Sequence, residues 1–209
     1  MRNKSMNIVI VAGSGRQTSQ SIRLAQWIAN KFETSETSYN VLDLYEYREL
    51  INYYEHDKPT ELNKTKTRML DIIDKADGVI IVSPEWGGML PPLLHQFLLL
   101  NAYGSADNRL PLANKPCSIV GISSSGGGHN PISLIKGYGA KNTHLSWLSE
   151  HVVINNVDIF IDSPTNHVHY EELLSRLHIM CEVQSIYAQQ LKPVRSKLNV
   201  LSSKHPFGQ

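Results

Sequence analysis

Five short apolar segments recur along the chain and are separated by stretches with a different spacing of apolar residues. The predicted strands are Met6 to Ala12, Tyr39 to Leu44, Gly78 to Ser83, Pro116 to Ser123 and His151 to Ile154. Four of the five are unbroken apolar runs rather than alternating ones. Such runs are typical of strands that are covered on both faces, as in a parallel sheet.

Three of the intervening stretches have the spacing of regular helices. Apolar side chains share one face in residues 22–32 and again in residues 62–76, as in amphipathic helices. The last helix carries a clear apolar stripe from Leu173 to Leu191, and Pro193 ends it. These stretches predict helices that cover the sheet.

Two further helical stretches are less regular. Residues 90–100 are apolar almost all round, which exceeds the single stripe that a helix needs to cover a sheet. In residues 130–148, Gly137 and Gly139 interrupt the pattern. We therefore expect a broken or late-starting helix there, secure only over residues 144–149.

Strands and helices alternate along the whole chain, which predicts a three-layer α/β sandwich with right-handed crossovers and helices on both faces. Five parallel strands fit the doubly wound order 2-1-3-4-5. At 209 residues the chain is long enough for one well-buried core. We expect a single domain over residues 1–192 and a C-terminal tail over 193–209, since residues after Leu191 show no periodic pattern.

Composition limits the possible partners and locations. A net charge of +1 argues against nucleic acid or an acidic membrane surface as the main target. The apolar stretch at 90–100 is too short to span a bilayer, which takes about 20 residues. Residues 1–5 lead directly into the first strand, so we expect no signal peptide. Cys117 and Cys181 occupy apolar positions, which favours a reduced, cytoplasmic protein.

In a sheet of this order, ligands bind beyond the carboxyl ends of the strands, where strands one and three diverge. Three loops reach that edge: residues 13–21, 84–92 and 123–129. The first joins a strand to a helix N-terminus, which favours anions. Ser14, Ser19 and Ser21 supply hydroxyls there, and Arg16 supplies a planar fork suited to phosphate. The alternative is that Ser19 or Ser21 only caps the helix.

Other site types fit less well. A dinucleotide loop needs Gly-x-Gly-x-x-Gly, but Thr18 stands at the third glycine position, and Asp43 alone is a weak ribose ligand. The triphosphate-binding Gly-Lys-Ser/Thr and the hydrolase Gly-x-Ser-x-Gly do not occur in these loops. His167 and His169 have no third ligand nearby in sequence, so we predict no metal site.

The first loop resembles that of the NADPH-dependent FMN reductases of the flavodoxin-like superfamily, which includes azo-dye and quinone reductases. Their loop reads Gly-Ser-x-Arg-x-x-Ser-x-Asn/Thr, and Gly13 begins the matching stretch in this chain. The resemblance implies a flavodoxin-like fold and FMN as the cofactor. It also implies that the cofactor, through its phosphate, is held by Ser14, Arg16, Ser19, Gln20 and Ser21.

The second loop is similar to the family's Pro-Glu-Tyr-Asn-Gly-Ser-Ile-Pro. Here Trp86 replaces the tyrosine and could present its ring to the isoalloxazine, although it could instead fill a gap in the core. Gly87 and Met89 replace the asparagine and serine, so backbone N–H groups would have to supply the hydrogen bonds to the flavin. The resemblance implies cofactor contacts from Pro84, Glu85, Trp86 and Gly87. Glu85 could shape this loop or the nicotinamide site without being catalytic.

The third loop, at residues 123–129, is similar to the family's Ser/Ala-Gly-Gly segment, which borders the flavin ring and ribityl chain. The implied contacts are Ser124, Ser125, Gly126 and Gly127. A plain flexible connector would explain the glycines equally well.

These features predict an FMN-dependent NAD(P)H oxidoreductase that passes a hydride to FMN and then electrons to a quinone, azo compound or free flavin. No catalytic acid, base or nucleophile is expected, because the cofactor performs the chemistry. The alternatives are a flavin-binding sensor or electron carrier, or a site for another phosphorylated ligand. The apolar surplus and the resemblance together predict a homodimer or homotetramer through residues 90–101, with contacts from Leu93, Phe97 and Leu100.

Overall fold

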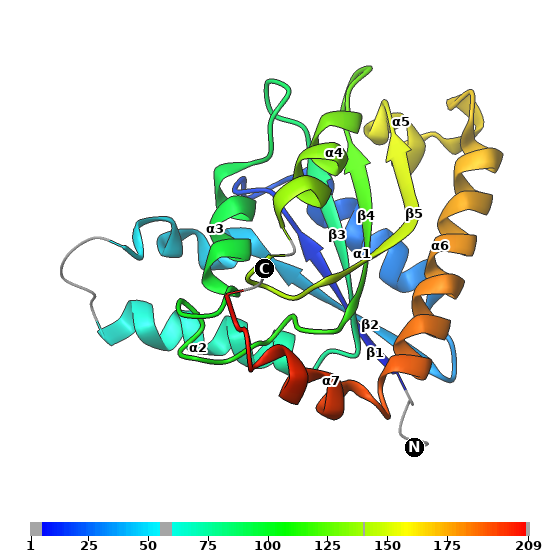
Figure 1. The fold of residues 1–209 in the computed structure, drawn as a ribbon. Coiled ribbons are helices and arrows are strands. Elements are labelled where there is room, and N and C mark those ends of the chain that lie inside the picture. Colours follow the sequence, from blue (N-terminus) through cyan, green and yellow to red (C-terminus); the bar gives the residue numbers. More distant parts are fainter. Residues whose placement is uncertain (1–5, 55–59, 140, 208–209) are drawn as a thin grey trace.

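The computed structural model describes residues 6–54, 60–139 and 141–207; the prediction about a signal peptide in residues 1–5 lies outside them. Its centre is a five-stranded, fully parallel sheet in the order β2-β1-β3-β4-β5 (Figure 1). The strands are β1 (Met6–Ala12), β2 (Thr37–Asp43), β3 (Gly78–Pro84), β4 (Pro116–Ile122) and β5 (Ser146–Ile154). The predicted fold class and strand order are confirmed.

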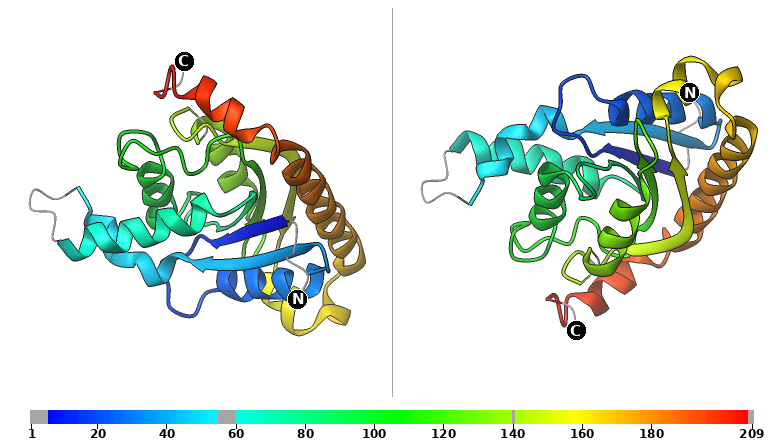
Figure 2. Two further views of the ribbon diagram at one scale, coloured as in Figure 1. Left: turned by 90° about the horizontal axis from the view of Figure 1, so that it is seen from below. Right: turned by 90° about the horizontal axis from the view of Figure 1, so that it is seen from above.

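Helices cover both faces of the sheet, which gives the three layers seen in Figure 2. One face packs against α1, α5 and α6, and the other against α2, α3 and α4. The bounds are α1 (Gln20–Phe32), η1 (Leu44–Asn52), α2 (Thr60–Asp74), α3 (Pro92–Leu100), α4 (His129–Tyr138), α5 (Val157–Asp162), η2 (Pro164–Asn166), α6 (Tyr170–Leu191) and α7 (Arg195–Ser202), where η marks a 3-10 helix.

Strand β1 shows why the strands read as unbroken apolar runs. Ile8 and Ile10 pack into the core beneath α1 and α6, whereas Val9 and Val11 pack into the core beneath α2 and α3. Successive side chains of a strand point to opposite faces, and both faces are buried here. Consecutive apolar residues are therefore found from Ile8 to Ala12, where the strand is buried on both faces.

The prediction for residues 130–149 is wrong. Helix α4 runs from His129 to Tyr138, and Gly139 is its C-cap residue, so the glycines mark the end of the helix. Residues 144–149, expected to be helical, instead lead into β5, which begins at Ser146. This strand lies at the edge of the sheet, and burial along it alternates in part, with Leu148 buried and Ser149 exposed. Its short apolar pattern was therefore open to a helical interpretation.

The surplus apolar surface of α3 is covered within the same chain. Helix η1, which the sequence did not predict, lies on it, and Gln96 Nε2 donates a hydrogen bond to the Leu50 carbonyl oxygen at 2.9 Å. The residues predicted to form a dimer contact are consequently buried in the core: Leu93, Phe97 and Leu100. That part of the dimer prediction is wrong. Leu99, 49% exposed, is the large apolar side chain that α3 presents outward.

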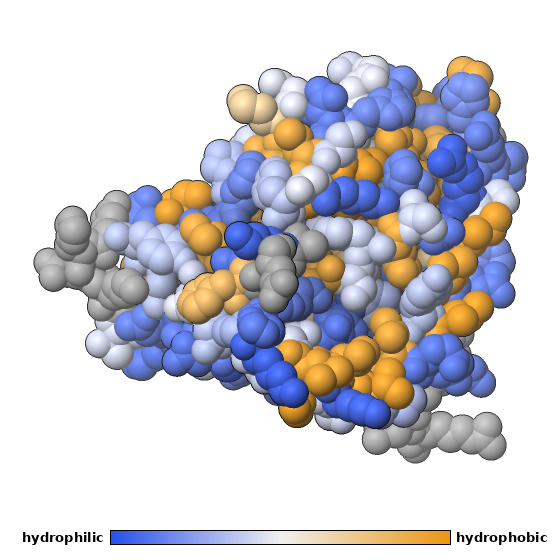
Figure 3. Space-filling model, in the orientation of Figure 1, coloured by the Kyte–Doolittle hydropathy of each residue, from blue (hydrophilic) through white to orange (hydrophobic). Residues whose placement is uncertain are grey.

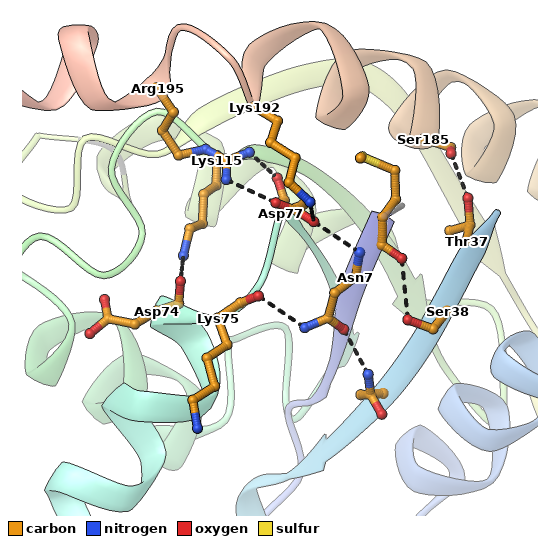
Figure 4. Close-up of polar contacts among 12 residues, drawn as sticks. Asn7, Thr37, Ser38, Asp74, Lys75, Asp77, Lys115, Ser185, Lys192 and Arg195 are labelled. Atoms are coloured by element: carbon orange, nitrogen blue, oxygen red, sulfur yellow. Dashed lines mark hydrogen bonds and ion pairs between the residues drawn. The ribbon is translucent and has the colours of Figure 1, made fainter. Parts of the chain in front are cut away.

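The amino end of the sheet is closed by a cluster of charges around Asp77 (Figure 4). Three groups donate hydrogen bonds to the Asp77 carboxylate: Lys192 Nζ at 2.9 Å, Arg195 Nη1 at 3.2 Å and the Asn7 backbone N–H at 3.1 Å. Burial alone would raise the pKa of Asp77, but these hydrogen bonds outweigh it and lower the pKa. The cluster fastens the junction of α6 and α7 to the start of β3.

Lys115 lies in the same region and is only 4% exposed. Its Nζ donates to the carbonyl oxygens of Ile73 and Asp74, at the C-terminal end of α2. Burial, reinforced by the positive charge of Arg195, lowers the pKa of Lys115 to about 7. A buried amine thus caps the helix in place of solvent.

The segment predicted to be a tail contains helix α7, which packs along the amino end of the sheet. Asn114 Nδ2 donates to Asn199 Oδ1 at 2.8 Å and thereby joins α7 to the turn before β4. The outer side of this region is apolar, as Figure 3 shows, with Val194, Val200 and Leu201 exposed. Among the described residues, none of the helices has the length and apolar character needed to cross a membrane.

Candidate functional site

A cleft of about 580 Å³ opens at the carboxyl end of the sheet. It lies beyond the ends of the neighbouring strands β1 and β3, between the loops that follow β1, β3 and β4. This is the position expected for a ligand site in a sheet of this strand order. Its walls are Ser14, Arg16, Thr18, Ser19, Gln20, Pro84, Glu85, Trp86, Gly87, Ile122, Ser123, Ser124, Ser125 and Val157. The three loops singled out from the sequence therefore converge on one site.

In the first loop, Ser19 is the N-cap of α1, and its Oγ accepts a hydrogen bond from the Ile22 N–H at 3.3 Å. Ser21 is fully buried, with its Oγ 3.0 Å from Ser19 Oγ. Ser21 therefore supports Ser19 from behind and does not line the cleft, contrary to its predicted place in the site. Ser19 therefore both caps the helix and lines the cleft.

The start of α1 is suited to an anion. Its first turn contains no acidic side chain, so no carboxylate within the turn neutralises the positive end of the helix dipole. Ser14 Oγ accepts from the Arg16 N–H at 3.1 Å, which leaves the hydroxyl proton of Ser14 to donate elsewhere. A phosphate would meet hydroxyls and backbone N–H groups here.

Arg16 and Trp86 join the first and second loops. The guanidinium carbon of Arg16 lies 4.6 Å from the centre of the Trp86 ring, within the range of a cation–π contact. Trp86 is half-buried and lines the cleft, so it does not fill a gap in the core. The ring is thus placed at the wall of the cleft with a cation stacked on it.

The second loop folds into a tight turn. Trp86 and Met89 exchange two backbone hydrogen bonds of 3.0 and 3.1 Å, and Gly87 and Gly88 between them have φ values of +58° and +80°. Turns with positive φ at both central positions favour Asn-Gly and Gly-Gly. Gly87 therefore keeps the backbone shape that asparagine would adopt there, although it offers no side chain to a ligand.

Glu85 connects the second loop to the third. Its Oε2 accepts hydrogen bonds from the N–H groups of Gly128, at 2.6 Å, and Asn130, at 3.3 Å. Its own N–H donates to the Ile122 carbonyl oxygen at 3.0 Å. The carboxylate therefore sits at the N-terminus of α4, where negative charge is favoured.

The third loop is also fastened to the segment after β5. Asn155 Nδ2 donates a hydrogen bond to the Gly127 carbonyl oxygen at 3.1 Å. The Asn156 N–H donates one to the Ser125 carbonyl oxygen at 3.3 Å. The loop is thus held on two sides rather than being a plain flexible connector. Ser124 and Ser125 line the cleft as predicted, but Gly126 and Gly127 do not. Gly126 faces a neighbouring groove instead.

Four residues of the cleft were not predicted: Thr18, Ile122, Ser123 and Val157. Thr18 and Ser123 belong to the predicted loops, so their position alone could have suggested them. Val157 begins α5, a helix too short to give a periodic signal. Within residues 6–54, 60–139 and 141–207, no three side chains of the metal-ligating kinds are grouped to hold an ion.

The sequence model of one family, NADPH-dependent FMN reductase, matches residues 6–154 and so covers all five strands and the three loops. The chain belongs to the NADPH-dependent FMN reductase family. Members of this family are NAD(P)H-dependent flavin oxidoreductases with FMN as the cofactor. A curated relative from Vibrio ruber, the NADH:(hydroxy)cinnamate reductase subunit CrdA, is 33% identical over 118 residues, or 56% of this chain and 54% of that protein. The chain thus matches about half the length of this relative.

Solved structures show the same fold at low sequence identity. RosB, with the bound intermediate 8-demethyl-8-formylriboflavin-5'-phosphate, has a TM-score of 0.67 at 14% identity, covering 91% of this chain and 81% of RosB. The apo NADH:FMN oxidoreductase EMOB has a TM-score of 0.60 at 13% identity, covering 89% and 90%. FerB, an NAD(P)H:acceptor oxidoreductase from Paracoccus denitrificans, has a TM-score of 0.56 at 14% identity, covering 89% and 98%. These neighbours support the flavodoxin-like fold.

Proposed function

We propose that this FMN reductase holds FMN in the cleft and passes electrons from NAD(P)H through it to a small-molecule acceptor. The observation that carries the proposal is that the N-terminus of α1, whose first turn has no acidic side chain, and the ring of Trp86 meet in one cleft. When bound, FMN would supply the redox chemistry between the nicotinamide and the acceptor.

The residues present fit the parts of FMN. Ser14, Ser19 and the start of α1 offer neutral donors to the phosphate, Gln20 borders that end, and Arg16 adds a cation. The ring would lie between the two remaining walls of the cleft. Those walls are formed by Pro84, Glu85, Trp86 and Gly87 on one side and by Ser124 and Ser125 on the other.

The chain contributes binding and position rather than proton transfer. Arg16 and Glu85 are the ionisable side chains among the described residues that line the cleft. Arg16 is stacked on Trp86, and Glu85 is engaged with backbone N–H groups of α4. We therefore propose that the reaction needs no side chain acting as a catalytic acid, base or nucleophile.

The acceptor is proposed to be a quinone, an azo compound, a free flavin or an aromatic acrylate. The first three follow from the family resemblance, and the last follows from the name of the Vibrio ruber relative. Met89 stands beside Trp86 at the turn of the second loop and is 62% exposed, which offers an apolar contact to a flat acceptor. The donor is NADPH by the family description and NADH by the relative's name.

Purification tests the proposal directly. We expect absorption bands of bound FMN, and we expect NADPH or NADH to bleach them under anaerobic conditions. Flavin that binds but is not bleached would favour the sensor or electron carrier instead. A colourless protein that does not bind added FMN would favour another phosphorylated ligand and refute the proposal.

Two further predictions are kept as proposals. Association as a homodimer or homotetramer would use the outward side of α3, where Leu99 borders a groove of about 420 Å³ that also contains His95 and Tyr138. A cytoplasmic location is supported by Cys117 and Cys181, which are both buried free thiols.

A further inference from the structure

The carboxylate of Glu85 links two loops, because Glu85 belongs to the second loop and its partner Gly128, 43 residues further along the chain, belongs to the third. From the second loop, it reaches the N–H groups of Gly128 and Asn130 at the start of α4. Glu85 also lines the cleft, whereas Gly128 and Asn130 are not among its lining residues. The side chain therefore spans from the cavity to the helix that carries the opposite wall.

The start of α4 depends on an acceptor from elsewhere in the chain. Its N-cap residue, Gly128, has a φ of +113° and no side chain with which to cap the helix. A carboxylate that accepts two N–H groups at a helix N-terminus makes charge-assisted hydrogen bonds, which are shorter and stronger than neutral ones. The distance of 2.6 Å to the Gly128 N–H is of that kind.

The space around the carboxylate is closely filled. A Cβ placed on Gly127 would lie 2.9 Å from Glu85 Oε1, so the loop backbone passes directly against the side chain. On the other side, a Cβ on Gly121 would lie 1.9 Å from the Gly128 carbonyl oxygen. The third loop is thus confined between Glu85 and the end of β4, and its distance from the second loop is set by that side chain.

We propose that Glu85 is a positioning residue that fixes the separation of the second and third loops and so prepares the half of the cleft that receives the flavin ring. The inference rests on the proposed function, because it takes FMN as the ligand. Glu85 acts through the backbone of α4 and the third loop rather than on the reacting atoms. The hydrogen bonds of the Glu85 carboxylate go to Gly128 and Asn130 and do not involve the first loop, which builds the phosphate half of the cleft.

The contact itself can be tested without any flavin. We expect the Gly128 and Asn130 amides of the ligand-free protein to exchange at least tenfold faster in Glu85→Ala, since a hydrogen bond to a charged group is lost. Glu85→Gln keeps an acceptor oxygen, so in this variant the same two amides should exchange less than threefold faster than in the wild type. Glu171→Ala removes an exposed glutamate from the first turn of α6 and serves as the matched control. Unchanged exchange in Glu85→Ala would overturn the inference.

The positioning role is tested by titrating FMN and riboflavin into the same proteins. Glu85→Ala should lower the affinities for FMN and riboflavin by a similar factor of about ten, since the two ligands share the ring. Glu85→Gln should keep most of the wild-type affinity for both. Faster exchange with unchanged affinities, or a loss confined to FMN, would overturn the positioning role. If the wild type binds neither flavin, the proposed function fails, and the exchange rates still decide whether Glu85 holds the loops together.

Discussion

The buried amine of Lys115 should make the stability of this protein depend on pH in an unusual direction. In the unfolded chain, a lysine keeps its proton up to a pKa of about 10.4. In the folded protein, burial and the charge of Arg195 lower the pKa of Lys115 to about 7. Between these two values the unfolded state binds more protons, so the free energy of unfolding rises with pH.

The magnitude follows from the size of the shift. Each unit of pKa difference corresponds to about 1.4 kcal/mol, so this group contributes about 3 kcal/mol of added stability between pH 7 and pH 9.5. Lys115→Met removes the titration and keeps an apolar chain of similar length. The carboxylates of Asp74 and Asp77, which partly offset the shift, remain in both proteins.

Urea unfolding of wild type and Lys115→Met at intervals from pH 6.5 to 9.5 provides the assay. As the pH rises across this range, the free energy of unfolding of the wild type should increase by about 3 kcal/mol relative to that of the variant. Lys64→Met, at an exposed site on α2, should follow the wild type at every pH. A difference between wild type and Lys115→Met that stays constant with pH would refute the reasoning.

The remaining predictions concern the cleft, the amino end of the sheet and the outward side of α3. Arg16→Ala should lower the affinity for FMN by about tenfold or more in fluorescence titrations, and that for riboflavin far less, because a charge-assisted phosphate contact is lost. An equal loss for both ligands would contradict the assignment of Arg16 to the phosphate. Gly87→Val should lower stability by about 1–3 kcal/mol in urea unfolding, whereas Gly87→Asn should cost less, because asparagine tolerates positive φ. Asp77→Asn should lower the unfolding free energy by about 1–3 kcal/mol at pH 7, and the difference should shrink as acid protonates the wild-type carboxylate; a constant difference would contradict the depressed pKa. Leu99→Lys should shift any dimer to monomer in size-exclusion chromatography with light scattering, and a wild type that is monomeric at micromolar concentration would exclude the interface.

The central strands could be predicted from the sequence because their environment is uniform. A strand such as β3, buried on both faces, carries a continuous run of apolar residues, and its short length and Val and Ile content favour a strand over a helix. The edge strand β5 lacks this uniformity, and its first residues were mistaken for a helix. Helix η1 was missed because Leu44 and Leu50 are its two buried residues, which is too few to establish a period.

The cleft could be located from the sequence, but its internal contacts could not. Loop positions follow from strand order, so Ser14, Trp86 and Ser124 could be assigned to one edge before any coordinates were known. The burial of Ser21 depends on which side of the N-cap faces the core, and this is decided by packing. The partner of Glu85 lies in a different loop, and nothing in the local sequence around Gly128 indicates it.

Two helix N-termini, those of α1 and α4, point toward the same edge of the sheet, and they differ in charge compensation. At α4 the positive end of the dipole is matched by Glu85, whereas α1 begins with the neutral cap Ser19. The attraction for an anion is therefore concentrated at the α1 end of the cleft, whereas the α4 dipole is already offset by a carboxylate. A ligand with an anionic tail and an uncharged ring can then lie in only one favourable orientation, with its tail at α1.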